Sequence, residues 1–169
     1  IKGGVRLLIS SPDTARIART TIPEKAPEEF LSSSVYIQTD DPEIKRTAQA
    51  IISGERDAMN AARRLVTWIY SNLRKRATAS VPSAVDVLHT REGDCNEHAM
   101  LLAALARAVG IPTKINVGFV YLEGAFYYHA WNSFYIGDGW IPVDATFGQL
   151  PADPTHVQLH EGELDEQAR

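Results

Sequence analysis

One cysteine, one histidine and one aspartate carry the chemistry that this sequence suggests. Cys95 is the only cysteine in the 169 residues, so the chain has neither an internal disulfide framework nor a paired-cysteine zinc or redox motif. A lone cysteine is either a small hydrophobic residue in the core or a reactive thiol. The residues around Cys95 have to decide between these two interpretations.

Cys95 falls at the predicted start of a helix. Asp94 is a good N-cap, and Glu97 three residues later completes a capping box. Unpaired backbone N–H groups and the positive end of the helix dipole favour an anion at this position, so we expect a thiol pKa below about 8.5. The carboxylates of Asp94 and Glu97 oppose that shift, because nearby negative charge raises a thiol pKa. Gly93 allows a substrate backbone to approach closely, which makes Gly93 and Asp94 candidate substrate-binding residues.

His129 and Asp144 are the candidate partners of this thiol. His129 lies within a predicted aromatic strand, and Asp144 ends the next predicted strand. Each residue also has a purely structural interpretation, as a satisfied core histidine and as the cap of a turn. Together with Cys95 they match an activated nucleophile, so we predict Cys95 as nucleophile, His129 as base and Asp144 as the residue that orients it. Trp131, on the same predicted face as His129, is a further candidate for substrate binding.

The strand register is an obstacle to this triad. A tight turn at residues 137–139 puts Asp144 nearly opposite Asn132, about 10 Å along the strand from His129. Pro142 cannot donate a hydrogen bond to the ladder, so we expect a bulge or bend there that moves Asp144 toward His129.

Apolar periodicity and capping residues predict helices first and strands afterwards. Four helices are expected, the second ending in a basic run at residues 74–76 that suits the helix dipole. The expected helices are 42–53, roughly 57–75, 84–88 and 95–109, the last largely buried. Alternating apolar residues then predict an antiparallel meander of three strands. These strands are 115–121, 126–136 and 140–144.

The predicted fold class is α+β, with the central helix packed on an antiparallel sheet. Residues 1–41 are expected to be an extended segment, with short strands at 5–9 and 35–37, or the end of a preceding domain. Residues 42–160 form the predicted catalytic domain, and residues 161–169 a flexible acidic tail. The aromatic group is predicted to be mostly core, with a minority lining a substrate groove: Phe126, Tyr127, Tyr128, Trp131, Phe134 and Tyr135. Phe119 and Tyr121 are candidates for the edge of that groove.

The motifs around these residues resemble the core of the transglutaminase-like superfamily. They are Gly93-Asp94-Cys95-Asn96-Glu97-His98-Ala99, Leu105-Ala106-Arg107-Ala108-Val109-Gly110-Ile111-Pro112, His129-Ala130-Trp131 and Gly139-Trp140-Ile141-Pro142-Val143-Asp144-Ala145-Thr146. The resemblance covers roughly residues 55–150 and implies a papain-like fold, the triad Cys95, His129 and Asp144, and an oxyanion hole using the Cys95 N–H. Residues 81–88 are similar to a segment that a tryptophan precedes in animal transglutaminases, and that tryptophan is absent here. The flanking domains and calcium sites of those enzymes are absent too, so the chain looks more like the bacterial, cysteine-peptidase-like members.

The predicted reaction is acyl transfer from an amide through a thioester on Cys95, without a cofactor, and most simply a hydrolysis by a cysteine peptidase or amidase. Two alternatives stay open: a protein transglutaminase, in which an amine resolves the thioester, and a non-catalytic peptide-binding module. A metal site formed by Cys95, His98 and His129 is disfavoured, because it lacks a second close ligand pair and leaves the motif at Asp144 unexplained. His98 is instead expected to pack or to add a polar group to the pocket.

Composition narrows the class of partner. Apolar residues make up 44% of the chain and the formal net charge is −4, which is typical of one globular domain and disfavours a nucleic-acid partner. There is no apolar run of 18 residues that would span a membrane. A peptide or protein substrate is therefore expected, and the oligomeric state is open. Because the chain begins at Ile1, we expect a processed protein or a piece of a longer one, either exported to the periplasm or, as a reduced thiol also allows, cytoplasmic.

Overall fold

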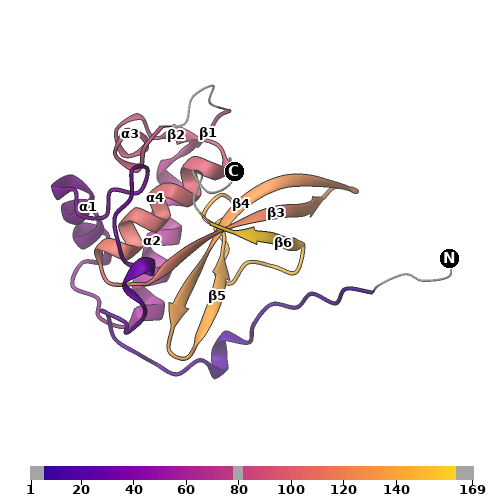
Figure 1. The fold of residues 1–169 in the computed structure, drawn as a ribbon, viewed down its shortest axis with the longest axis horizontal. Helices are drawn as coiled ribbons and strands as arrows, with labels where there is room; N and C mark the ends of the chain where they lie inside the picture. Colours follow the sequence, from indigo (N-terminus) through magenta and orange to yellow (C-terminus); the bar gives the residue numbers. More distant parts are fainter. Residues whose placement is uncertain (1–5, 78–81, 163–169) are drawn as a thin grey trace.

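The computed structural model describes residues 6–77 and 82–162, and confirms the α+β fold class (Figure 1). A helical group on one side packs against a four-stranded antiparallel sheet on the other. The helices are α1 (Pro42–Ile52), α2 (Ala58–Asn72), α3 (Ala84–Thr90) and α4 (Cys95–Ala108), with short 3-10 turns η1 (Thr14–Arg16) and η2 (Glu28–Phe30). The strands are β1 (Arg74–Lys75), β2 (Glu92–Gly93), β3 (Thr113–Leu122), β4 (Ala125–Ile136), β5 (Gly139–Val143) and β6 (His156–Glu161). No helix among these described residues is both long and apolar enough to cross a bilayer.

Helix α4 is the centre of the molecule. It contacts β3 and β4 on one side and α1, α2 and α3 on the other, so almost no face of it meets solvent (Figure 1). Every residue from 97 to 107 is buried. This enclosure explains why its sequence is apolar around most of the helix, as predicted.

The helix starts agree with the capping residues in the sequence. The side chains of Asp41, Asp57, Ser83 and Asp94 each accept a hydrogen bond from a backbone N–H of the first turn that follows. Capping satisfies donors that the helix itself cannot pair, and it is encoded within four residues of sequence. Helix starts were for that reason predictable here.

The end of α2 differs from the prediction. The helix ends at Asn72, and residues 74 and 75 form strand β1, which runs parallel to β2 with Lys75 opposite Gly93. The expectation that the basic run serves the helix dipole is wrong, because Arg74 and Arg76 both pair with the carboxylate of Glu92, Arg76 at 2.9 Å. This pairing attaches the end of α2 to the two residues that precede the Asp94 cap.

The sheet has the order β5-β4-β3-β6, and its last strand, β6, was not predicted. The short strands expected at 5–9 and 35–37 are absent from the described part of those segments, and Val5 lies outside it. Strand β6 includes Glu161, the first residue of the expected tail, and residues 163–169 lie outside the described residues. The division into domains stays a prediction.

Two details of register decide how the strands place their side chains. The β4–β5 ladder runs without interruption through Ser133 and Pro142, so the bulge expected at Pro142 is wrong. An irregularity occurs instead between β3 and β6, at Val117 and Gly118. There the backbones come so close that a Cβ on Gly118 would lie 2.0 Å from the carbonyl oxygen of Val157.

The substitution Gly118→Ala is expected to destabilise the protein by about 1–3 kcal/mol, because the added methyl group must push β6 away from β3. Urea unfolding measures this free energy. Gly139→Ala is the matched control, since a Cβ there meets nothing within 4 Å. Equal stability of the two variants would contradict the close approach of β6.

Candidate active site

The start of α4 places Cys95 as the sequence predicts. Asp94 Oδ1 accepts a hydrogen bond from the Asn96 N–H at 2.9 Å, and the Asp94 N–H donates to Glu97 Oε2 at 2.7 Å. Both bonds of the capping box are therefore present. Gly93 is buried, and a Cβ there would lie 2.2 Å from the Cβ of Glu97. The glycine thus makes room for the capping glutamate, which is a different need from the close approach of substrate that we expected.

The charge state of Cys95 differs from the prediction. Burial raises the pKa of the Cys95 thiol to about 11, and the negative charges of Asp94 and Asp144 raise it further, against hydrogen bonds from the backbone N–H groups of Ala130 and of Cys95 itself. The expected lowering by the helix start is thus outweighed, and the resting thiol keeps its proton. The Ala130 contact also shows that the sulfur lies against β4, at the residue that follows His129 in the chain.

His129 and Asp144 are in direct contact. His129 Nε2 lies 2.7 Å from Asp144 Oδ2, and both side chains are buried. No bulge is needed for this contact: Asn132 pairs with Val143, so Asp144 continues beyond the ladder toward Trp131, which shares a face of the sheet with His129. Diagonal neighbours on one face of a sheet are within reach of long side chains.

A second histidine, His156, binds the same carboxylate oxygen. Its Nε2 lies 3.0 Å from Asp144 Oδ2, while Oδ1 accepts the backbone N–H groups of Thr146 at 2.7 Å and Phe147 at 3.2 Å. Burial alone would raise the pKa of Asp144, but the hydrogen bonds and charges of the two histidines outweigh it and hold that pKa well below its usual range. Asp144 is therefore a buried carboxylate.

Sequence reasoning missed His156 because it missed β6. A signal was present: Val157 and Leu159 alternate with polar residues in a segment of six. That alternation is typical of a half-buried strand. Nothing local, however, indicates that the first residue of this strand reaches Asp144.

The three side chains His129, Asp144 and His156 offer ligand atoms within 4.8 Å of one another, as a metal site would. Their hydrogen bonds argue for a different use. His156 Nδ1 lies 3.1 Å from the Asp153 carbonyl oxygen and 3.3 Å from Asp153 Oδ1, so both nitrogens of His156 face acceptors and both carry protons. Both nitrogens of His156 are thus used in hydrogen bonds to acidic partners.

His98 does not join these groups. It is buried, its Nδ1–H donates to the Asp94 carbonyl oxygen at 2.6 Å, and burial lowers its pKa. Within the described part of the chain, Cys95 and His98 do not assemble with His129 into a set of metal ligands. His98 packs, as expected.

The aromatic residues divide into two groups. Trp131 is only 2% exposed, and its ring and that of Phe147 both lie nearly parallel to His129, with centroids at 6.1 Å and 4.9 Å. Trp131 thus holds the histidine ring, and its role in substrate binding stays a prediction. The expectation of a core position is right for Phe134 and wrong for three residues toward the β3–β4 turn, namely Phe126, Tyr127 and Tyr128.

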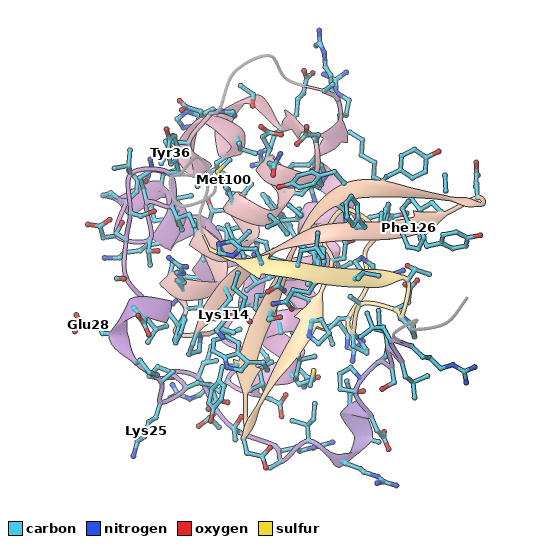
Figure 2. The ribbon with its side chains drawn as sticks, turned by 45° about the vertical axis from the view of Figure 1, so that its right-hand side comes forward. Lys25, Glu28, Tyr36, Met100, Lys114 and Phe126 are labelled. Atoms are coloured by element: carbon cyan, nitrogen blue, oxygen red, sulfur yellow. The ribbon has the colours of Figure 1, made fainter. Side chains whose placement is uncertain are left out.

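The exposed aromatic residues lie along the end of the β3–β4 hairpin, together with Phe119 and Tyr121. Figure 2 shows Phe126 near the tip of this hairpin, far from the helical side on which Met100 is labelled. Tyr128 is 56% exposed and lies close enough to Cys95 that the thiol, after partial burial, raises the pKa of its phenol. Tyr128 is the exposed aromatic side chain that borders the candidate nucleophile.

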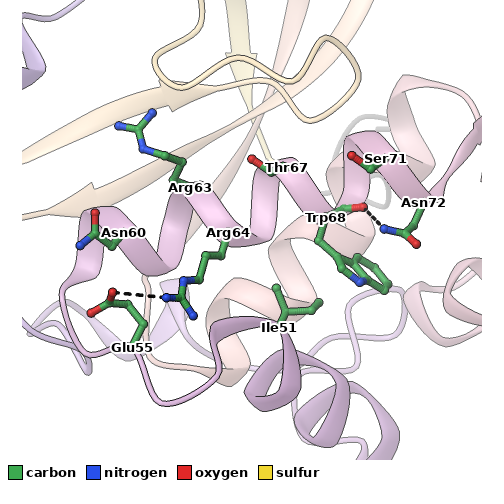
Figure 3. A pocket seen from close by; sticks show the side chains of 9 residues that line it. All are labelled: Ile51, Glu55, Asn60, Arg63, Arg64, Thr67, Trp68, Ser71 and Asn72. Carbon is green, nitrogen blue, oxygen red and sulfur yellow. Dashed lines mark hydrogen bonds and ion pairs between the residues drawn. The ribbon is translucent and has the colours of Figure 1, made fainter.

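Two cavities bear on the choice of site. The larger, of about 650 Å³, lies along the outer side of α2, where Glu55, Arg64 and Trp68 line it (Figure 3). None of the three predicted triad residues lines it, so it is not assigned to the chemistry. A cavity of about 280 Å³ is lined by Trp131 and His156, together with Leu7, Ile9 and Ser10 of the N-terminal segment.

The comparisons with known proteins identify the family and the fold. The family model of the transglutaminase-like superfamily matches residues 45–145, and the chain belongs to this superfamily. No curated protein matches the chain by sequence.

Solved structures share the fold. A proposed cysteine protease from Cytophaga hutchinsonii superimposes with a TM-score of 0.72 and 26% identity, over 91% of this chain and 50% of that chain. The periplasmic domain of TgpA from Pseudomonas aeruginosa gives a TM-score of 0.56 and 21% identity, over 70% of this chain and 46% of that one. A proposed protease from Parabacteroides distasonis gives 0.51 and 18%, over 76% and 30%. The chain thus spans about half the length of the first two structures.

Asp94→Asn is expected to increase the rate of Cys95 alkylation by iodoacetamide at pH 8 about two- to threefold, because it removes a charge that raises the thiol pKa while keeping a good N-cap. The wild-type rate is expected to keep rising up to pH 10. Asp57→Asn, the same change at the N-cap of α2, is the control and leaves the rate unchanged. A slower Asp94→Asn variant contradicts this electrostatic account.

Asp144→Asn is expected to lower the free energy of unfolding by about 3–5 kcal/mol, because it leaves a buried charged histidine without its partner. The depressed pKa of Asp144 stabilises the fold above about pH 4, and the raised pKa of His156 does so below about pH 6.5. The free energies of unfolding of wild type and Asp144→Asn, measured with urea, are therefore expected to differ most between about pH 4 and about pH 6.5. Asp86→Asn, at an exposed carboxylate with a lowered pKa, is the control and is expected to matter far less.

Proposed function

We propose that the chain is a cysteine-dependent amide hydrolase that acts on peptides or proteins, with Cys95 as nucleophile, His129 as base and Asp144 as the group that orients the base. The observation that carries the proposal is the buried hydrogen bond from His129 to Asp144, on the strand whose Ala130 N–H contacts the sulfur of Cys95. A buried carboxylate that binds an imidazole next to a thiol is the arrangement of an activated nucleophile.

The hydrogen bond determines which nitrogen acts as the base. Asp144 is ionised and can only accept, so His129 Nε2 carries the proton of the 2.7 Å bond. The lone pair of a neutral His129 is then on Nδ1, which is free to take the proton of Cys95. Trp131 and Phe147, nearly parallel to the ring, limit its rotation.

Proton transfer accompanies attack, because the resting thiol is neutral. Cys95 Sγ bonds to the amide carbonyl carbon as its proton passes to His129 Nδ1, and the carbonyl oxygen becomes an oxyanion. His129 then protonates the amide nitrogen, the C–N bond breaks, and the amine leaves a thioester on Cys95. Water, deprotonated by His129, attacks the thioester, and the C–S bond breaks to give an acid and the thiol.

The start of α4 supplies a group for the oxyanion. The backbone N–H of Cys95 is at the first helical position, where helix geometry provides no intrahelical acceptor, and it lies against the sulfur. Gly93 and Asp94 immediately precede it and remain our candidates for contact with substrate backbone. Tyr128, exposed beside the thiol, joins them.

Hydrolysis is proposed over transfer to an amine because of the structural likeness at 26% identity to a proposed cysteine protease. The chain spans half the length of that protein. The assignment of a peptide or protein substrate is therefore part of the proposal. The two outcomes share every step up to the thioester and differ in what resolves it.

The test is incubation of the protein with a peptide library in ¹⁸O-labelled water, with and without methylamine, followed by mass spectrometry. Wild type is expected to give cleaved or deamidated peptides that carry one ¹⁸O. Cys95→Ser and His129→Ala are expected to lower the rate at least about 100-fold. His160→Ala, at an exposed histidine of β6, is the matched control and keeps the wild-type rate.

Methylamine adducts in place of ¹⁸O products would assign a transglutaminase instead. Peptide binding without any cleaved, deamidated or methylamine-modified product would overturn catalysis and assign a binding module.

A further inference from the structure

His156 is held between two acidic residues at the start of β6. Its side chain is buried, with Nε2 3.0 Å from Asp144 Oδ2 and Nδ1 facing the carbonyl oxygen and the carboxylate of Asp153. All of these atoms are acceptors. Both ring nitrogens must then donate, which makes His156 an imidazolium.

The electrostatic surroundings agree with this charge. Burial alone would lower the pKa of His156, but the hydrogen bond and charge of Asp144, with those of Asp153, outweigh burial and raise it. Asp153 is itself held by Gln149 and Thr155, so its carboxylate is fixed on the far side of the ring from Asp144.

We propose that His156 is a positioning residue that shares Asp144 with His129 and, through its positive charge, sets the pH range in which His129 can exchange a proton with Cys95. The inference rests on the proposed function and adds a fourth residue to its site. His156 touches neither the thiol nor, in the proposed reaction, the substrate, so its effect passes through Asp144.

The physical reason is that one oxygen, Asp144 Oδ2, accepts hydrogen bonds from the imidazole rings of both His129 and His156. While His156 is charged, it balances Asp144, and a proton added to His129 adds a net positive charge to a buried cluster. The two imidazole centroids are 5.6 Å apart, and charges at that distance interact strongly when they are shielded from water. If His156 were neutral, the whole charge of Asp144 would be available to a protonated His129.

The groups that face His156 come from every neighbouring element. They are Asp144 after β5, Asp153 in the loop before β6, and His129, Trp131 and Phe147. The N-terminal segment adds Leu7, Ile9 and Ser10 to the adjoining cavity, and β6 adds Gln158, none of which is charged. Among the described groups that face it, Asp144 and Asp153 are therefore its counter-charges.

The test needs no substrate: it is the pH dependence of Cys95 alkylation by iodoacetamide, followed from pH 5 to about pH 12 so that the plateau above the thiol pKa of about 11 is reached. His156→Gln keeps a donor for Asp144 and removes the charge. Without that charge, protons leave His129 and Cys95 less readily, so the rate profile is expected to move to higher pH by about one unit. His160→Gln, the same change at an exposed histidine of the same strand, leaves the profile in place.

A uniform fall in rate without a shift of the profile would overturn the proposal and leave His156 a structural residue. A wild-type profile that His129→Ala does not change is a different outcome, since it would reject the Cys95–His129 pair itself and with it the proposed function.

If His156→Gln fails to fold, the protonation state of His156 can be measured directly on the wild type. Selective ¹⁵N labelling of histidine and two-dimensional NMR read the protonation of each ring nitrogen. Two protonated nitrogens on His156 at pH 6.5 are expected, and a neutral ring there would overturn the proposal.

Discussion

The buried carboxylate of Asp144 is the interaction on which the site depends. It is fully buried, and its two oxygens accept four hydrogen bonds: two from the imidazoles of β4 and β6, and two from the backbone of the turn after β5. An ionised group without such partners would be too costly to bury. The carboxylate therefore links three segments of the sheet, and the same bonds that keep it charged orient His129.

The surroundings favour the charged form of Asp144 but the neutral form of the Cys95 thiol. Burial and two negative charges keep Cys95 protonated at rest, although it occupies a helix position that favours an anion. In the proposed reaction the base takes the proton of Cys95 during the attack, so the position of His129 matters more than the resting charge of the sulfur. In the proposed mechanism, the network around Asp144, including the hydrogen bond from His156, therefore controls the reactivity of the thiol.

Local sequence predicted the fold where local forces decide it. The four helix starts follow from side chains that cap the next turn, and the burial of α4 follows from apolar residues on all its faces. Predictions failed where residues distant in the chain come together: α2 ends at Asn72, and residues 74 and 75 form a strand that pairs with β2. The aromatic residues 126–128 are exposed because the β3–β4 hairpin extends beyond the helices that would cover it (Figure 2).

By itself the sequence determined that Cys95 begins a helix, because Asp94 and Glu97 form the cap within four residues of it. It also determined that His129 lies on a strand and that Asp144 comes at the end of the next one. Only the tertiary structure decided that His129 and Asp144 meet without a bulge, since the ladder carries Asp144 past Val143 onto the face of His129. It also decided the charge of the thiol and the place of His156. The charge of the thiol and the place of His156 both depend on burial and on carboxylates that come from separate segments of the chain. No local sequence pattern encodes the distances between those segments.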